Sequence, residues 1–300
     1  MSAPKRATAR LAVGVIGVGR VGAVLGAALA RAGHRVVAGT GVSAESVARA
    51  ARLLPAVPLL PADEVVARAD LVLLAVPDDE LGPLVAGLAE TGAWRPGQLV
   101  VHTSGAHGIS VLASAARAGV LPLALHPAMT FTGSAHDVDR LPGTSFGITA
   151  PRSLWPVAEA LVAELGGIPV RVPEQARPLY HAALVVGANH LVTLVAESAD
   201  LLRRAGIADP APVLRPLLAA ALDNALRDGD GALTGPVSRG DAGTVGGHLR
   251  TLAEQAPDSV AGYVALARLT AGRALASGQL SPAQAAPLLD VLAARTRTDA

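Results

Sequence analysis

The sequence contains no cysteine and a single lysine, and each shortage excludes a type of chemistry. Without cysteine, the chain has no disulfide, no thiol nucleophile and no cysteine-type zinc site. Lys5 lies in a polar N-terminal segment and the other 24 basic residues are arginines. We therefore expect no lysine to act in an active site as acid, base or Schiff-base amine.

Aromatic residues are also scarce, because Phe, Tyr and Trp occur twice each, and the net charge is only +1. A nucleic-acid surface needs clustered basic residues and stacking aromatics. We therefore expect no nucleic-acid partner.

The 300 residues are 51% hydrophobic and 16% charged, which predicts a globular chain of roughly two domains. The most apolar late stretch, AALVVGANHLVTLVAES, contains Asn189, His190 and Glu197. It falls short of the ~20 apolar residues that a membrane span needs. Because the missing cysteines give no support to secretion, we expect a cytoplasmic protein with no membrane partner.

Strand-like and helical patterns alternate through the first half of the chain. This alternation predicts an α/β fold, with a doubly wound, mainly parallel Rossmann sheet and helices on both faces. The expected strands lie within residues 11–19, 34–40, 70–78, 98–105, 120–127, 146–150 and 168–173. The expected helices lie within residues 19–33, 43–54, 81–90, 109–119 and 154–166.

No strand-like run follows residue 173, and the rest of the chain is helical in pattern. We expect a disordered tail at 1–10, a dinucleotide-binding domain at 11–173 and an all-α domain at 174–300. The helices expected in the last domain lie at 175–206, 212–228, 241–256, 258–277 and 281–297.

A glycine-rich motif follows the first expected strand and opens the first expected helix. In such a GxGxxG motif, Gly17 permits the tight turn, Gly19 lets the backbone approach a pyrophosphate, and Gly22 allows close helix packing. The helix N-terminus adds amide donors and a positive dipole. The full predicted phosphate-binding loop is Gly17, Val18, Gly19, Arg20, Val21 and Gly22.

The end of the second strand decides the choice of cofactor. An NAD site usually places Asp or Glu there to bind the ribose hydroxyls. No acid occurs between Val37 and Ala44, whereas Thr40 and Ser43 offer hydroxyls to a 2′-phosphate. The sequence therefore favours NADP, with NAD as the alternative.

Polar and small residues follow the next two strands at the edge where ligands bind in doubly wound sheets. Val76 and Pro77 are candidates to line the nicotinamide side, and Thr103, Ser104 and Gly105 are candidates to bind substrate.

The alternative for the polar residues in these segments is helix capping. It applies to Asp78, Asp79 and Ser104, and for Asp79 it is our prediction. Ser104 remains open between capping and catalysis.

Histidines provide the candidate proton donors. His126 lies at a further strand end, with a structural hydrogen-bonding role as its alternative. His181 and Asn189 are eight residues apart, close to two helical turns, so we expect them along one helix face with a catalytic role. Tyr180 and His190 are weaker candidates.

The glycine-rich segment 233–249 holds Arg239, a candidate bidentate clamp for a substrate carboxylate. The alternative is a local ion pair of Arg239 with Asp241, which we expect to cap the following helix. The scattered histidines lack the spacing of metal ligands, so no metal is expected.

These motifs resemble a known family. GVIGVGRVGAVLGAALARAGH, LLAVPDDEL, VVHTSGAHG, LALHPAMTF, FGITA, GANHLVTL and LTGPVSRGDAGTV occur in the order found in Rossmann-like proteins with domain of unknown function 2520 (DUF2520). The resemblance implies an NADP-binding domain and a helical domain through which the protein forms a homodimer.

The chain is more distantly similar to the 6-phosphogluconate dehydrogenase-like superfamily. Its ketopantoate reductases use a catalytic lysine near the start of the long helix, where this chain has Tyr180 and His181. Pyrroline-5-carboxylate reductases work without that lysine, and the His-Pro pair at His126 is closer to prephenate dehydrogenases.

We therefore predict an NADP-dependent oxidoreductase that transfers hydride between nicotinamide and a small carbonyl, imine or hydroxy-acid substrate. A ketopantoate reductase-like activity is the first to test. The alternative is a non-catalytic NADP-binding sensor or a dimeric scaffold protein.

Overall fold

The computed structural model describes residues 10–294, which form two compact units. The first unit ends at Asn189 and the second begins at His190. Lys5 and the predicted disordered tail lie outside the described residues, apart from Arg10. The first unit has the predicted α/β architecture and the second is helical, so the predicted fold class is confirmed.

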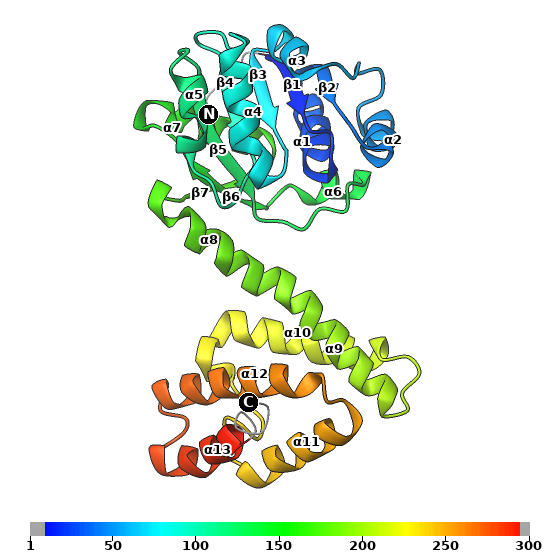
Figure 1. Cartoon of the computed structure of the whole chain (residues 1–300), viewed down its shortest axis with the longest axis vertical. Helices are drawn as coiled ribbons and strands as arrows, with labels where there is room; N and C mark the ends of the chain where they lie inside the picture. Colours follow the sequence, from blue (N-terminus) through cyan, green and yellow to red (C-terminus); the bar gives the residue numbers. More distant parts are fainter. Residues whose placement is uncertain (1–9, 295–300) are drawn as a thin grey trace, which may run out of the picture. The chain divides into compact units, whose positions relative to one another are not determined.

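A seven-stranded sheet with the order β2-β1-β3-β4-β5-β6-β7 forms the centre of the first unit (Figure 1). Neighbouring strands pair in parallel, except for the antiparallel pair of β5 and β6. Every predicted strand is present. The strands are β1 (Ala12–Ile16), β2 (Arg35–Thr40), β3 (Leu71–Leu74), β4 (Leu99–His102), β5 (Leu121–Pro127), β6 (Ser145–Thr149) and β7 (Ile168–Arg171).

The strand order identifies where a ligand binds. β1 lies between β2 and β3, so the winding of the chain reverses at β1. Outside β2, an isolated parallel bridge joins Gly39 to Leu59. With this bridge counted as a strand, the order becomes that of the Rossmann fold, whose ligands bind beyond the carboxyl ends of the strands at the reversal point.

Helices cover both faces of the sheet because its strands are apolar on both sides. In β3, Leu71 and Leu73 belong to the core that contains α1 and α7, whereas Val72 and Leu74 belong to the core that contains α3 and α4. Two short helices, α3 and α6, were not predicted. The helices of this unit up to β7 are α1 (Arg20–Arg31), α2 (Ala44–Leu53), α3 (Ala62–Arg68), α4 (Asp78–Glu90), α5 (Ala113–Ala116), α6 (Ala135–Arg140) and α7 (Trp155–Glu164).

A continuous helical segment, Glu174–Arg204, connects the two units. It comprises a 3-10 turn, α8 (Arg177–Leu184), a π-helical turn (Val185–Asn189) and α9 (His190–Arg204). We predicted the domain boundary at 173/174. The first unit instead extends to Asn189, because α8 makes contacts with the sheet.

Within residues 10–294, Glu174–Arg204 is the one helix that is long and apolar enough to cross a membrane, with a mean hydropathy of 1.5. None of its most apolar window is buried. This window therefore presents exposed apolar residues.

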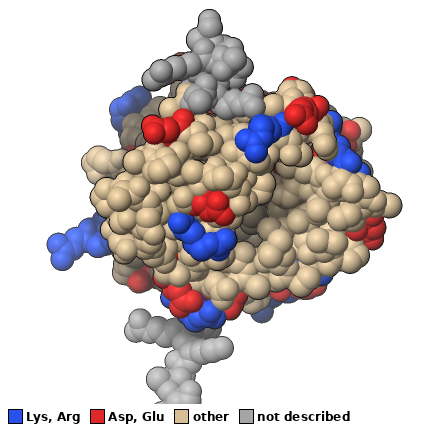
Figure 2. All heavy atoms as spheres, turned by 90° about the horizontal axis from the view of Figure 1, so that it is seen from below, with Lys and Arg blue, Asp and Glu red and all other residues tan. Residues whose placement is uncertain are grey.

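The second unit has its own core of small and aliphatic side chains. Ala267, Ala271 and Ala274 of α12 pack with Leu249 of α11 and Leu288 of α13. Basic and acidic side chains are interspersed on the face shown in Figure 2 rather than gathered by sign. After α9, the helices are α10 (Ala211–Asp228), α11 (Ala242–Gln255), α12 (Ser259–Ala276) and α13 (Pro282–Ala294), with bounds close to those predicted.

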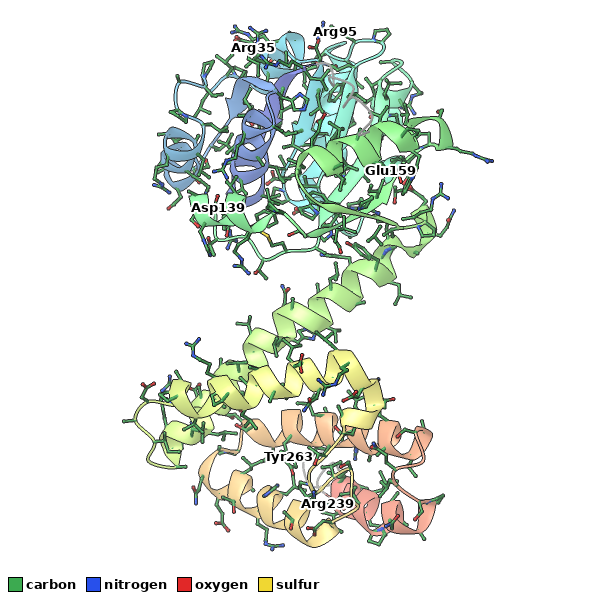
Figure 3. All side chains as sticks on the ribbon, turned by 180° about the vertical axis from the view of Figure 1, so that it is seen from behind. Arg35, Arg95, Asp139, Glu159, Arg239 and Tyr263 are labelled. Atoms are coloured by element: carbon green, nitrogen blue, oxygen red, sulfur yellow. The ribbon has the colours of Figure 1, made fainter. Side chains whose placement is uncertain are left out.

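Two helices of the second unit carry a histidine and a tyrosine that lie within hydrogen-bonding distance of each other. Tyr263 of α12, labelled in Figure 3, has its hydroxyl 2.8 Å from Nδ1 of His248 on α11. The helical unit thus contains a His–Tyr pair of its own.

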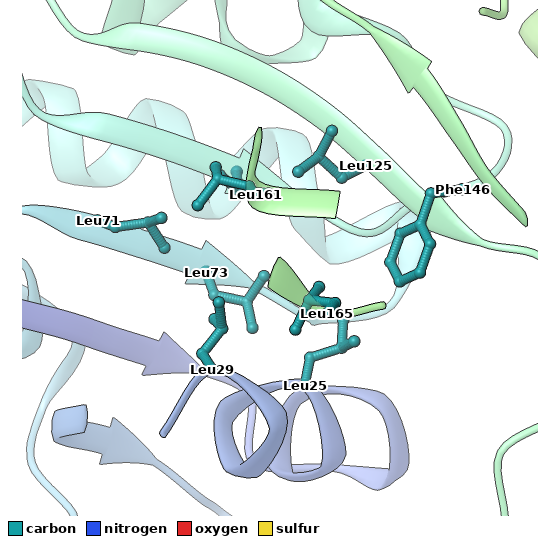
Figure 4. Close-up of a pocket in the computed structure, with 9 residues that line it drawn as sticks. Leu25, Leu29, Leu71, Leu73, Leu125, Phe146, Leu161 and Leu165 are labelled. Atoms are coloured by element: carbon teal, nitrogen blue, oxygen red, sulfur yellow. The ribbon is translucent and has the colours of Figure 1, made fainter. Parts of the chain in front are cut away.

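The core of the sheet unit contains a small cavity of about 20 Å³ (Figure 4). A water molecule in such a space would need two to four polar partners, and the lining side chains are all apolar. The cavity is a packing defect rather than a binding site. It is lined by Leu25, Leu29, Leu71, Leu73, Val101, Leu125, Phe146, Leu161 and Leu165.

Candidate active site

The loop between β1 and α1 has the conformation that the glycine motif predicts. Gly17 has a φ of +90°, and a Cβ there would lie 2.5 Å from the carbonyl oxygen of Ala75. A Cβ on Gly22 would lie 2.1 Å from the carbonyl oxygen of Gly17. The fold therefore requires glycine at both positions, for the turn and for the close approach of α1.

Gly19 differs from these two glycines, because a Cβ there would meet no atom within 4 Å. Gly19 is the N-cap of α1, and neither a capping side chain nor an acidic residue occupies the first turn. The free amides and the positive dipole of α1 thus face open space, which fits a dinucleotide pyrophosphate. Exposed Arg20 begins α1, whereas Val18 is fully buried and Val21 packs against the same core.

The two hydroxyls at the end of β2 already support the backbone. The Thr40 Oγ1 accepts a hydrogen bond from the Gly17 amide at 2.9 Å. Ser43 is the N-cap of α2, and its Oγ accepts from the Ser46 amide at 3.1 Å. The Thr40 hydroxyl still has its own proton to donate, so the predicted 2′-phosphate contact remains open to Thr40. The Ser43 hydroxyl also faces the Glu45 carboxylate, whose pKa it helps to lower, so a 2′-phosphate would compete with Glu45 for the Ser43 proton.

The segment after β3 places Val76 and Pro77 at the predicted edge of the sheet. Pro77 is the N-cap of α4, and no side chain caps this helix. The prediction that Asp79 caps a helix is therefore wrong. Asp78 and Asp79 lie in the first turn, where their charges favour the helix dipole.

The loop after β4 is held by His102, which was not among the predicted site residues. Ser104 donates its amide to Nδ1 of buried His102 at 3.2 Å, so the proton of His102 is on Nε2, which donates to the Gly108 carbonyl at 2.8 Å. Burial lowers the pKa of His102 to about 4. Its neutral ring fixes the loop that carries Thr103, Ser104 and Gly105.

Ser104 has a local backbone role in this loop but does not cap a helix. Its Oγ accepts a hydrogen bond from the His107 amide at 3.1 Å, and the following 3-10 helix begins after Gly108. Thr103 is partly exposed, and its Oγ1 makes a long contact of 3.5 Å with the Leu74 carbonyl.

A histidine and a tyrosine meet at the carboxyl end of β5. Nδ1 of His126 lies 3.0 Å from the hydroxyl of Tyr180, which belongs to α8. Burial, followed by the charge of Arg177, lowers the pKa of His126 to about 4, and burial raises the pKa of Tyr180. Both side chains are therefore neutral near pH 7.

Two glycines make room for this pair. Gly147 of β6 is opposite His126 in the strand register, and a Cβ on it would lie 2.6 Å from the Tyr180 hydroxyl. A Cβ on Gly105 would lie 2.6 Å from Cδ2 of His181 and 3.0 Å from Nε2 of His126. Because glycine has no side chain, Gly105 leaves space for the rings of His126 and His181.

The rings of His181 and His126 lie near each other, with centroids 6.0 Å apart. Asn189 does not join this pair. Asn189 is exposed at the end of the π-helical turn, and its side chain forms no hydrogen bond with other described residues. The π-helical turn changes the number of residues per turn between the two positions. The predicted two-turn spacing of His181 and Asn189 therefore does not hold.

Arg177, which begins α8, is fully buried beside this pair and was also not among the predicted site residues. The signal that could have found it is the i, i+3, i+4 spacing of Arg177, Tyr180 and His181, which places all three on one helix face. Glu174, one turn earlier, accepts hydrogen bonds from the amides of Ile109 and Ser110 at 2.8 and 3.0 Å.

Arg239 lies in the second unit, in the connection between α10 and α11 (Figure 3). It is exposed and forms none of the ion pairs within 4 Å among the described residues. The alternative of a local ion pair with Asp241 is thus not observed. Asp241 caps α11 as predicted, accepting from the Thr244 amide at 3.0 Å. No group of three or more side chains within residues 10–294 is arranged to hold a metal ion.

The fold and its glycine loop define a Rossmann-type protein with an additional helical unit. Residues 2–127 match the Rossmann-like domain, and residues 144–270 match the domain of unknown function DUF2520. The chain thus combines a Rossmann-like domain with a DUF2520 domain, as its motifs indicated. A search of curated proteins found no match.

Solved structures share this architecture over most of the chain. The candidate NADP oxidoreductase BF3122 from Bacteroides fragilis is 25% identical, with a TM-score of 0.72, over 88% of this chain and 98% of that one. Streptomyces aurantiacus imine reductase is 20% identical, with a TM-score of 0.63, over 93% and 99%. An imine reductase from Pseudomonas sp. is 19% identical, with a TM-score of 0.60, over 89% and 96%.

Proposed function

We propose that this protein is an NADP-dependent oxidoreductase acting on a small carbonyl, imine or hydroxy-acid substrate. The observation that carries the proposal is the His126–Tyr180 pair, at the same edge of the sheet as the open glycine loop. Structures of similar fold are a candidate NADP oxidoreductase and imine reductases, which supports the reaction class.

The proposed cofactor site uses the amides around Gly19 and the start of α1 for the pyrophosphate. Arg20 extends the positive charge of this helix end. Thr40 holds a 2′-phosphate through its hydroxyl proton with Ser43 beside it, and the absence of an acid between Val37 and Ala44 favours NADP over NAD. A nicotinamide bound here would supply or accept a hydride, and Val76 and Pro77 would line its side of the site.

Tyr180 is the proposed proton donor and acceptor of the reaction. Its hydroxyl stays protonated near neutral pH because burial raises its pKa. His126 holds the hydroxyl in place and returns its proton after each turnover, receiving one at Nε2 while it releases one from Nδ1. His181 lies beside His126, because Gly105 has no Cβ to occupy the space that both rings share.

We assign substrate-binding roles to the remaining predicted residues. Thr103, Ser104 and Gly105 line the substrate side of the pair. Arg239 remains a candidate clamp for a substrate carboxylate, and Asn189 a candidate orienting residue.

The experiment that tests the proposed function works before the physiological substrate is identified. NADPH is titrated against the protein by tryptophan fluorescence, and NADPH oxidation is then followed with 2-keto acids, ketones and cyclic imines, beginning with ketopantoate. Saturable binding and turnover of one class support the proposal. Saturable binding without turnover of any class would favour the sensor, and no binding would favour the scaffold.

We also propose that a second copy of the chain covers the exposed apolar residues of α9 and α10. Val192, Leu217 and Leu226 are 67%, 62% and 81% exposed. Light scattering should give about twice the 30.0 kDa chain mass, and Leu217→Glu with Leu226→Glu should give the monomer. The cytoplasmic location remains an expectation.

A further inference from the structure

Arg177 is a buried cation whose hydrogen-bonding partners in the described part of the chain are all uncharged. Its side chain is 0% exposed, and guanidinium groups remain protonated in proteins. Nε donates to Oγ1 of Thr149 at 2.8 Å, and Nη1 donates to the Ser104 carbonyl at 3.2 Å. Nη2 donates to the carbonyls of Ala124 and Gly147 at 3.0 and 2.9 Å.

No carboxylate within residues 10–294 neutralises this charge by direct contact. Arg177 forms none of the ion pairs within 4 Å among the described residues. Glu174 acts on Arg177 only at longer range, and its carboxylate is already held by two backbone amides. Burial of an unpaired charge costs folding free energy. A purely structural role would therefore lower the stability of the fold without a functional gain.

The charge lies next to the proposed proton donor. Cζ of Arg177 is 5.8 Å from the centre of the Tyr180 ring. Its charge disfavours protonation of His126 and favours the anion of Tyr180, so both groups experience a positive potential. His181 acts on His126 in the same direction, and Asp78 acts in the opposite one.

We propose that Arg177 makes this site selective for the interconversion of a carbonyl and an alcohol, over the reduction of an iminium cation. The inference rests on the proposed function and narrows its substrate class. Arg177 is a positioning residue, which acts through the potential at Tyr180 and through the loop after β4 and the strands β5 and β6, whose oxygens it binds.

The step that benefits is the one in which an oxygen becomes negative. In the reducing direction, the carbonyl carbon receives the hydride with its two electrons, and the electron pair of the broken C–O π bond moves to the oxygen. The Tyr180 hydroxyl gives its proton to that oxygen. His126 then supplies a proton from Nδ1 to the tyrosinate and takes one from water at Nε2. A nearby buried cation stabilises both anions, whereas it repels an iminium ion.

The first test compares two substrates that both carry a carboxylate. Ketopantoate presents a ketone and 1-piperideine-2-carboxylate presents a cyclic imine, and in both the carboxylate is attached to the reacting carbon. We expect kcat/KM to be about tenfold or more higher for the keto acid. A preference for the imino acid would overturn the inference and leave the proposed function intact. Failure to bind NADPH would instead remove the proposed function.

The second test measures the potential at Tyr180 without turnover. The chain has two tyrosines, so Tyr263→Phe leaves Tyr180 as the single phenol, whose ionisation is followed by ultraviolet absorbance. In this background we expect Arg177→Met to raise the pKa of Tyr180 and Arg177→Lys to restore it. An unchanged pKa in folded Arg177→Met would overturn the inference. If Arg177→Met does not fold, the substrate comparison decides alone, because it uses the unmodified protein.

Discussion

The hydroxyl of Tyr180 lies 3.0 Å from Nδ1 of His126, joining the long connecting helix to the carboxyl end of β5. Both groups are neutral near pH 7, because burial lowers the pKa of the histidine to about 4 and raises that of the tyrosine. In the proposed mechanism, this pair has the proton-donor role that the resemblance assigns to a lysine in ketopantoate reductases. Lys5 is the only lysine in this sequence.

The two histidines near Tyr180 should differ in importance. His126→Ala removes the hydrogen-bond partner of the hydroxyl, so we expect kcat to fall about 100-fold, within the usual range for a positioned proton-transfer group. His181→Ala removes only a ring contact at a centroid distance of 6.0 Å, and we expect less than about a tenfold loss. Steady-state kinetics on both variants checks this order, and a larger loss in His181→Ala would reverse the assignment.

Substitutions of Gly19 and Gly22 should have different effects, because the first should weaken ligand binding and the second should lower stability. Gly19→Ala places its methyl group in open space, so thermal stability should be unchanged while NADPH binding weakens by about tenfold or more, because the methyl group blocks the backbone amides. Gly22→Ala meets the Gly17 carbonyl and should lower the melting temperature by several degrees. Gly87→Ala on α4, which also meets no atom within 4 Å, is the control for both measurements. Unchanged NADPH affinity in Gly19→Ala would contradict the proposed pyrophosphate site.

The end of β2 should determine the preference for NADP. Val42 is fully exposed, so Val42→Glu adds a negative charge beside Thr40 and Ser43 without a steric clash. NADPH affinity should fall by about tenfold, because the 2′-phosphate meets a like charge, while NADH affinity should not fall. Val47→Glu, on an exposed position of α2, is the matched control. Equal losses for both cofactors would place the 2′-phosphate elsewhere.

Acid should weaken the sheet unit through buried His102. Its pKa is about 4 in the folded state, below the ordinary histidine value of 6.5. In the unfolded chain, His102 therefore binds a proton below about pH 6.5. In the folded chain, it binds this proton only below about pH 4. The contribution of His102 to the free energy of unfolding should fall by about 3 kcal/mol over this interval. His126, whose pKa in the folded state is also about 4, adds a loss in the same direction.

Denaturant unfolding at pH 7 and pH 4.5, followed by tryptophan fluorescence, measures this effect. Trp94 and Trp155 both belong to the sheet unit, so the signal reports that unit. His102→Asn removes the titrating group and should reduce the difference between the two pH values. An equal difference in the variant would assign the acid sensitivity to other residues.

The features that the sequence predicted depend on local backbone chemistry. The loop from Gly17 to Gly22 follows from the few conformations and close approaches that only glycine permits, and the strands follow from short apolar runs. The antiparallel direction of β6 was not predicted, because the residues between β5 and β6 carry no strand-direction signal. The short helix α6 within that connection was also missed.

The site itself depends on residues that are distant in the sequence. His126 and Tyr180 are 54 positions apart, and Tyr180 was a weaker candidate than His181 because nothing local shows which side chain reaches β5. Arg177 was missed for the same reason, since the carbonyls that accept its hydrogen bonds come from three separate segments of the chain.

The most direct test of the account is the rate of NADPH oxidation by Tyr180→Phe, with Tyr263→Phe as the control. Tyr263 forms the other His–Tyr pair, with His248 at 2.8 Å, so the control removes an equivalent hydroxyl far along the chain. We expect Tyr180→Phe to lower kcat by about 100-fold or more with NADPH affinity unchanged, and Tyr263→Phe to leave both unchanged. Equal turnover by Tyr180→Phe and the unmodified protein would contradict the account.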